Sequence, residues 1–169
     1  MRQTIGSTWI YQLVILFILI FVSFLVLALT YSKNFKNKNE VLNIIEKYEG
    51  VTADSVAIMN NYLNYNGYKT VGRCPQGEGT WIASTDLQST TLVKANANQK
   101  YFYCLKKVNS TKPTTTGKST PSNTTFYEVV LFYKFNVPVI QSVATFTVNG
   151  VTSDIISHKD LYDKIVYGK

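Results

Sequence analysis

The sequence predicts an α+β protein in which a long N-terminal helix, first transmembrane and then amphipathic, packs on a small antiparallel β-sheet. Three observations lead to this fold class. An uncharged apolar run fills Trp9–Leu29, apolar residues then recur every three or four positions as far as Tyr48, and beyond Gly67 the apolar period shortens to two. A period near 3.6 is typical of a helix, and a period of two is typical of a strand.

The first element is a transmembrane helix over residues 9–30, which follows a short leader or tail at residues 1–8. Trp9–Leu29 holds 21 residues without one charge. As a helix it spans about 31 Å, close to the thickness of the hydrocarbon layer. The alternative is a secretory signal that is cleaved off, but the apolar part of such a signal has only about 7–15 residues. We therefore expect the helix to be retained.

The helix is expected to continue as an amphipathic extension over residues 31–49. The sequence has no Pro or Gly between Tyr31 and Glu49, and Gly50 is a natural helix terminator. One side of this extension is apolar and must pack on something; it comprises Tyr31, Phe35, Val41, Leu42, Ile44, Ile45 and Tyr48.

Residues 50–169 are expected to form an extracytoplasmic α+β domain that begins with a short helix. Thr52 is suited to cap this helix, because Val51 and Val56 flank it as a hydrophobic staple and Asp54 lies in the first turn. Gly67 would end it. Strands are predicted next, at Tyr68–Cys74, Thr80–Ser84 and Lys100–Lys106.

Residues 108–125 are rich in Ser, Thr, Pro and Gly, and we expect a flexible loop there. Asn109 and Asn123 each begin an Asn-X-Thr acceptor pattern for glycosylation. These two sequons matter only in a eukaryotic secretory pathway, and chance matches are common in a segment so rich in Asn and Thr.

The C-terminal third carries the clearest strand signal. Along Phe126–Phe135 alternate residues are apolar or aromatic, which predicts one face on the core. Pro138 indicates a turn, and a second strand is expected over Val143–Val148. Asn149-Gly150 predicts a tight hairpin turn, after which Val151–Ile156 would return as a third strand.

Cys74 and Cys104 lie in segments that are read as strands, and we favour a disulfide between them. In an oxidising compartment this bond would stabilise the fold by about 3–4 kcal/mol on the loop-entropy model. Two free thiols are the alternative. A catalytic cysteine is the least favoured reading, because it needs an electropositive neighbourhood and the only histidine, His158, is far along the chain.

The motif content predicts no enzyme. A single histidine excludes every motif that needs two, and no phosphate-binding glycine loop or nucleophile elbow is present. We expect no catalytic, cofactor-binding or metal-binding residues and no cofactor. The carboxylates Asp154, Asp160 and Asp163 are interpreted as solvated surface. Lys106-Lys107 beside three aromatic residues is interpreted as an exposed sheet edge, and no nucleic-acid partner is expected although the net charge is +7.

Two features disagree about orientation. More lysines follow the apolar run than precede it, and the positive-inside rule read alone would place the domain in the cytoplasm. The paired cysteines, the Thr-rich stretch and a tail of about eight residues before the helix favour the opposite arrangement. We expect the N-terminus inside and the C-terminal domain outside.

The order of elements resembles that of type IV pilins and pseudopilins, and most closely the TadE-like minor pilins of tight-adherence (Tad) systems. The resemblance rests on Trp9-Ile10-Tyr11-Gln12 leading into the apolar run and Tyr31-Ser32-Lys33, and on Phe126–Phe135 with Pro138 and a following Phe146-Thr147-Val148 strand. It implies that Gly6 ends a leader that a prepilin peptidase removes. Many members of that family have Glu five residues after this Gly, where this chain has Tyr11.

The resemblance implies a membrane-anchored minor pilin-like subunit of a type IV or Tad-like pilus or secretion assembly. Its partners would be membrane lipid, other pilin-like subunits and an assembly platform. Its location would be the membrane, as a single-pass protein, or a filament on the cell surface. The alternative is a bitopic membrane protein with an extracellular binding or sensor domain, which would share the anchor but form no filament.

Overall fold

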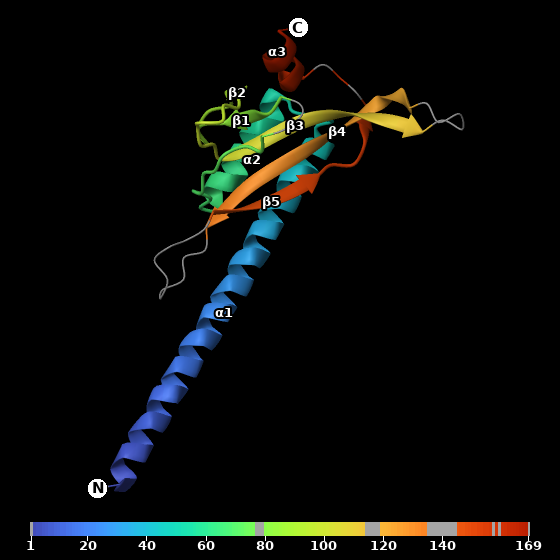
Figure 1. Ribbon diagram of the computed structural model, residues 1–169. Helices are drawn as coiled ribbons and strands as arrows, with labels where there is room; N and C mark the ends of the chain where they lie inside the picture. Colours follow the sequence, from blue (N-terminus) through green and yellow to red (C-terminus); the bar gives the residue numbers. More distant parts are fainter. Residues whose placement is uncertain are drawn as a thin grey trace.

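The computed structural model describes residues 2–76, 80–113, 119–134, 145–156, 158 and 160–168. Its dominant element is one long helix, α1 (Arg2–Lys47). The second half of α1 packs against a small antiparallel sheet, and the first half extends away from the domain as an arm (Figure 1). The predicted α+β class, with a long N-terminal helix on a small sheet, is confirmed.

The helix stays continuous because residues 7–49 contain neither Pro nor Gly. Val41 and Ile45 are completely buried, and Leu42 and Ile44 are nearly so. Most of the predicted apolar stripe therefore lies in the core. Tyr31 and Phe35 do not, since they are 54% and 44% exposed.

A tight turn joins α1 to the second helix, α2 (Ala53–Tyr65). Glu49 and Gly50 both adopt positive φ, which ends α1. Thr52 accepts a hydrogen bond from the Ser55 amide, and the Ser55 hydroxyl accepts one from the Thr52 amide, which makes a capping box. Val51 and Val56 are fully buried. The predicted cap and staple are both present.

The sheet has six strands, all antiparallel, in the order β2-β1-β3-β4-β5, with β6 also paired to β4. Their bounds are β1 (Ile82–Ser84), β2 (Leu92–Lys94), β3 (Tyr103–Pro113), β4 (Ser119–Lys134), β5 (Thr145–Val151) and β6 (Ile155–Ile156). Strand β2 was not predicted. The strand predicted at Tyr68–Cys74 is wrong, because that segment makes only an isolated bridge between Gly72 and Tyr101. A short helix, α3 (Leu161–Tyr167), ends the chain.

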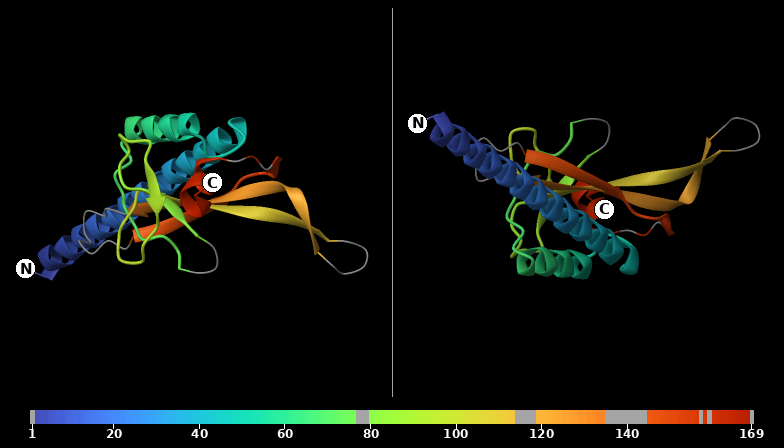
Figure 2. Two further views of the ribbon diagram at one scale, coloured as in Figure 1. Left: turned by 90° about the horizontal axis from the view of Figure 1, so that it is seen from above. Right: turned by 90° about the horizontal axis from the view of Figure 1, so that it is seen from below.

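The predicted loop over residues 108–125 is wrong for most of its length. Strand β3 continues to Pro113 and β4 begins at Ser119, and the two pair from Tyr103–Leu131 outward to Pro113–Ser119. Figure 2 shows this hairpin extending beyond the rest of the domain. The physical reason is that Thr, with its branched Cβ, favours the extended backbone once a partner strand is available.

The hairpin turn predicted at Asn149-Gly150 is also wrong, because β5 runs straight through both residues and Gly150 pairs with Val129. Strand β6 then pairs with Thr124 and Thr125 on the same β4 strand. The turn predicted at Pro138 lies outside the described residues, as does Phe135.

The sheet is covered on both faces. Helices α1 and α2 cover one face, where Tyr103, Val129 and Leu131 join the main core, and α1 crosses this face in the view from below (Figure 2). The other face carries a smaller cluster around Val130 and Phe132, which Cys74, Ala83, Tyr101 and Cys104 complete. The prediction of one buried face was therefore incomplete.

Candidate functional site

The arm of α1 exposes a continuous apolar surface. None of its most apolar segment is buried inside the molecule, and the mean hydropathy of that segment is 3.2. Trp9 and Leu29, at the two ends of the run, are 70% and 71% exposed. By length and composition α1 can cross a membrane. A surface this large and apolar must be covered by lipid or by other protein.

Two hydroxyl groups in or beside the apolar run bond back to the helix. The Ser23 hydroxyl donates to the carbonyl of Leu19 at 2.8 Å, and the Thr30 hydroxyl donates to that of Val26 at 2.8 Å. A hydroxyl bonded back to its own helix exposes no unpaired donor to hydrocarbon. The Ser23 and Thr30 hydroxyls are thus compatible with a lipid environment.

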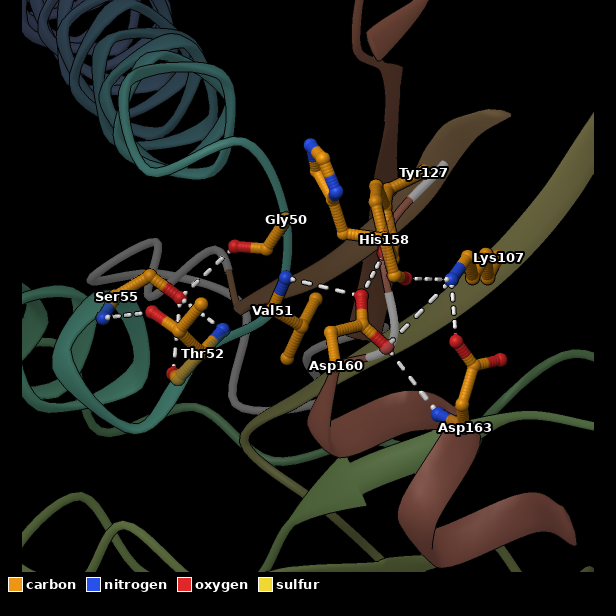
Figure 3. A network of polar contacts seen from close by, with 9 residues as sticks. All are labelled: Gly50, Val51, Thr52, Ser55, Lys107, Tyr127, His158, Asp160 and Asp163. Carbon is orange, nitrogen blue, oxygen red and sulfur yellow. Dashed lines mark hydrogen bonds and ion pairs between the residues drawn. The ribbon is translucent and has the colours of Figure 1, made fainter. Parts of the chain in front are cut away.

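A buried polar network fixes the domain to the end of α1, and Figure 3 shows its residues. Its centre is Asp160, whose side chain is only 3% exposed. The Asp160 carboxylate accepts a hydrogen bond from the Tyr127 hydroxyl on β4 and one from the Val51 amide at 3.4 Å. It also caps α3 by accepting from the Asp163 amide. We call Val51, Lys107, Tyr127, Asp160 and Asp163 the Asp160 network.

Lys107 supplies the cation of this network. Its side chain is 6% exposed, and its ammonium lies 3.7 Å from Asp160 and 2.6 Å from Asp163. It also donates to the backbone carbonyl of His158 at 2.8 Å. Lys107 and Tyr127 are direct cross-strand partners, so both side chains emerge on the same face of the sheet.

The chemistry of the network is structural. Burial, and then the neighbouring Asp160 carboxylate, raise the pKa of Tyr127 far above its ordinary value, so the hydroxyl stays protonated and keeps donating. The groups are bonded to one another, and the side chains of Lys107 and Asp160 are nearly buried. The network instead joins four segments: the α1–α2 turn, β3, β4 and α3 (Figure 3).

The three carboxylates predicted to be solvated behave differently from one another. Asp154 is exposed, as predicted. Asp163 is partly buried against Lys107. The prediction is wrong for Asp160. This residue caps the start of α3, and its buried carboxylate accepts a hydrogen bond from the Val51 amide. Asp160 and Asp163 stand three positions apart at the start of a segment whose apolar residues are Leu161, Tyr162, Ile165 and Val166. This pattern is a helix-start signal and could have revealed that Asp160 caps a helix.

The two neighbouring lysines point to opposite faces of β3. Lys106 pairs with Glu128 at 3.3 Å and lies over the ring of Trp81. Both lysines are therefore engaged in ion pairs, and the exposed-edge interpretation is wrong for the buried Lys107 side chain. The His158 side chain is 54% exposed and lies beside Glu49.

Cys74 and Cys104 form a disulfide, with their Cα atoms 5.7 Å apart. The bond ties the irregular segment after α2 to β3, on the sheet face opposite α1. Gly72, two residues before Cys74, lies directly against the Phe132 ring, where any side chain would overlap it. The disulfide and this close contact thus hold the segment around Gly72 and Cys74 against the smaller apolar cluster that contains Phe132.

Gly6, the predicted leader cleavage point, lies within the first turns of α1. Within the described residues, no group of three or more His, Cys, Asp or Glu side chains is placed to hold a metal ion.

No family model matches the chain, and comparisons with curated proteins and with solved structures likewise found no match.

Proposed function

We propose that this chain is a membrane-anchored, pilin-like subunit of the TadE-like kind. The arm of α1 holds it in the bilayer before assembly and then packs with the arms of other subunits in a pilus or secretion filament. The observation that carries the proposal is the continuity of α1, whose exposed apolar half and buried half belong to one helix. Such a helix stores the subunit in lipid and transfers the same surface to a protein core.

The domain has features suited to the exterior of a cell. The Cys74–Cys104 disulfide persists in oxidising compartments. The charged fraction of the chain is 16%, against about 25% in ordinary soluble domains, and the difference is made up partly by Asn, Ser and Thr. Both features support an N-terminus inside and a domain outside.

The test is to tag the C-terminus and follow the protein by surface proteolysis and by shearing of intact cells. Release of the tag with sheared filaments supports the proposal. Mass analysis of the released chain reports whether it begins at Ser7, as cleavage after Gly6 requires. A Gly6→Leu variant is the matched control, because it blocks that cleavage and leaves the apolar run unchanged.

Tyr11 favours a second candidate, since a pilin-like chain often carries Glu at this place. This candidate is a bitopic membrane protein whose external domain binds a ligand or acts as a sensor. It predicts a tag that external protease removes but that shearing leaves in the membrane. A tag protected from external protease in intact cells contradicts both candidates.

A further inference from the structure

A hollow of about 260 Å³ opens where α1 enters the domain. About two turns of α1 past the apolar run form one side of it, and the segment after α2 and the last residues of β4 form the others. Figure 1 shows the ends of α2 and β4 on the side of the domain nearer the N-terminus of α1. The hollow therefore lies at the end of the domain that faces the arm.

The lining of the hollow is cationic. Lys33 comes from α1, Lys69 from the segment after α2, and Lys134 from the end of β4. Among the described residues no Asp or Glu lines it, and the first acidic residue in the printed sequence is Glu40. Glu40 acts on Tyr62 of α2, whose pKa is raised by burial and by this carboxylate. Three lysines from three different segments thus line the hollow, with no carboxylate among its described lining residues.

Asn37 adds a second, independent observation. Its side chain is only 3% exposed, it lines the hollow, and its amide has no hydrogen-bond partner among the described residues. The neighbouring Asn34 amide, by contrast, donates to the Thr30 carbonyl at 2.9 Å. Among the described residues no buried side-chain nitrogen or oxygen lacks a partner, so the polar atoms of Asn37 reach open space at the hollow and are not sealed in the core. The Asn37 amide is positioned to donate into the hollow.

The position of the hollow along α1 matches the polar headgroup layer of a bilayer. Lys33 follows Leu29, the last residue of the apolar run, by four positions, which is about 6 Å along a helix. The headgroup region on each side of the hydrocarbon is about 5–8 Å thick. When α1 spans the membrane, Lys33 lies among the lipid phosphates and Asn37 lies just above them.

We propose that this hollow binds the phosphate-bearing headgroup of an anionic lipid from the membrane that α1 crosses. Phosphate oxygens accept charge-assisted hydrogen bonds from the three lysines and a further bond from Asn37. Juxtamembrane lysines attract anionic lipid, and enclosure between three elements makes the attraction specific to one headgroup. The inference rests on the membrane anchor of the proposed function but not on filament assembly or on the orientation of the chain.

The test uses the full chain in detergent and native mass spectrometry with added phosphatidylglycerol or phosphatidylcholine of the same acyl chains. We expect the first phosphatidylglycerol to bind at least tenfold more tightly than the first phosphatidylcholine. The triple variant Lys33→Gln, Lys69→Gln, Lys134→Gln is expected to reduce this preference to about twofold or less. The matched control, Lys36→Gln, Lys47→Gln, Lys100→Gln, changes the charge equally at exposed positions that do not line the hollow.

A single variant, Asn37→Leu, keeps every charge and removes only the amide, and it is expected to weaken phosphatidylglycerol binding several-fold. It also guards against misfolding of the triple variant, and near-ultraviolet circular dichroism checks both. Equal loss in the two triple variants, or no lipid preference in the wild type, overturns the proposal. Glycerol phosphate at millimolar concentration is added as a competitor of phosphatidylglycerol. If it competes as effectively as lipid does, the site binds a soluble phosphate ester, and the lipid assignment is overturned.

Failure of the anchor itself gives a different result. A chain that stays in solution without detergent contradicts the membrane anchor and with it the proposed function. A chain that requires detergent but shows no headgroup preference contradicts the lipid site alone.

Discussion

Gly150 of β5 lies directly against Leu42 of α1, so that a Cβ at position 150 would come within 2.8 Å of a Leu42 methyl group and 2.9 Å of Lys38. This contact lets the sheet approach the helix closely enough to bury the apolar stripe. It also explains why Asn149-Gly150 is not a turn. The glycine is needed for the approach of two elements rather than for a positive φ.

The first prediction is that Gly150→Ala destabilises the domain by about 1–3 kcal/mol, the usual effect of overpacking a core. The measurement is urea unfolding of the detergent-solubilised protein, followed by near-ultraviolet circular dichroism. Thr147→Ala, at an exposed position of the same strand, is the control and should change the unfolding free energy by less than about 0.5 kcal/mol. Equal effects of the two variants would contradict the close contact.

The second prediction concerns the Asp160 network. Asp160→Ala leaves Lys107 with one carboxylate partner, removes the cap of α3 and frees the Tyr127 hydroxyl. We expect a loss of about 3–5 kcal/mol, as is typical when one partner of a buried ion pair is removed. Asp154→Ala at the exposed Asp154 should cost less than about 0.5 kcal/mol. The two variants differ in burial but not in the chemical change, so similar unfolding midpoints would disprove the role given to Asp160.

The third prediction is a loss of stability in alkali. Burial raises the pKa of Tyr162 to about 12, and it raises the pKa values of Tyr68, Tyr103 and Tyr127 further. Because each folded pKa exceeds the unfolded value near 10, this contribution is complete below pH 10. It is lost progressively as the pH rises toward and beyond 12.

The measurement for this prediction is an absorbance titration of tyrosine ionisation, run beside an unfolding curve. The buried tyrosines should ionise only as the fold is lost. Tyr127→Phe should reduce the dependence of stability on pH above 10. If every tyrosine ionised near pH 10 in the folded protein, the burial of these hydroxyls would be disproved.

The fourth prediction is that Cys74→Ala with Cys104→Ala lowers the free energy of unfolding by about 3–4 kcal/mol on the loop-entropy model. The bond closes a loop with a sequence separation of 30 residues. Reduction of the wild type should lower its stability by a similar amount and leave the double variant unaffected. A reductant that destabilised both proteins equally would place the effect elsewhere in the chain.

The fifth prediction tests the arm. Leu16→Arg with Ile20→Arg places two charges near the centre of the apolar run, and each costs about 2.5–3.5 kcal/mol on insertion scales. We expect loss of the membrane-bound pool and of any assembly. The control, Leu16→Ala with Ile20→Ala, removes the same side chains without adding charge and should remain membrane-bound. Normal membrane retention and assembly of the charged variant would refute the proposed function.

The elements that the sequence predicted well are those determined by local pattern. The long apolar run and the stripe ending at Tyr48 set α1, and the Thr52 cap with the Val51–Val56 staple sets the start of α2 through contacts within five residues. The alternation along β4 likewise comes from neighbouring positions. In each case the residues that carry the pattern are the same residues that form the element, or lie next to them in the sequence.

The features that were missed depend on distant partners. Lys107 and Asp160 are separated by 53 positions in the printed sequence, and nothing near either residue indicates that they meet. The β3–β4 hairpin was missed because its Ser, Thr and Pro content is typical of loops, while its pairing comes from register across two strands. The second apolar cluster needed the Cys74–Cys104 link to bring Gly72 onto Phe132.

Because α1 is one unbroken helix from the arm into the core, the direction in which the domain faces around the helix axis is set by how the arm is rotated about that axis. One residue inserted between Lys33 and Asn34 would rotate the domain about the helix axis by about 100° and raise it by about 1.5 Å. Every described surface of the domain, the paired strands β3 and β4 and the lysine-lined hollow included, would then face a different direction relative to its neighbours. The helix thus sets the direction in which the domain faces as well as its distance from the arm. Adding or removing a single residue between arm and domain would change both.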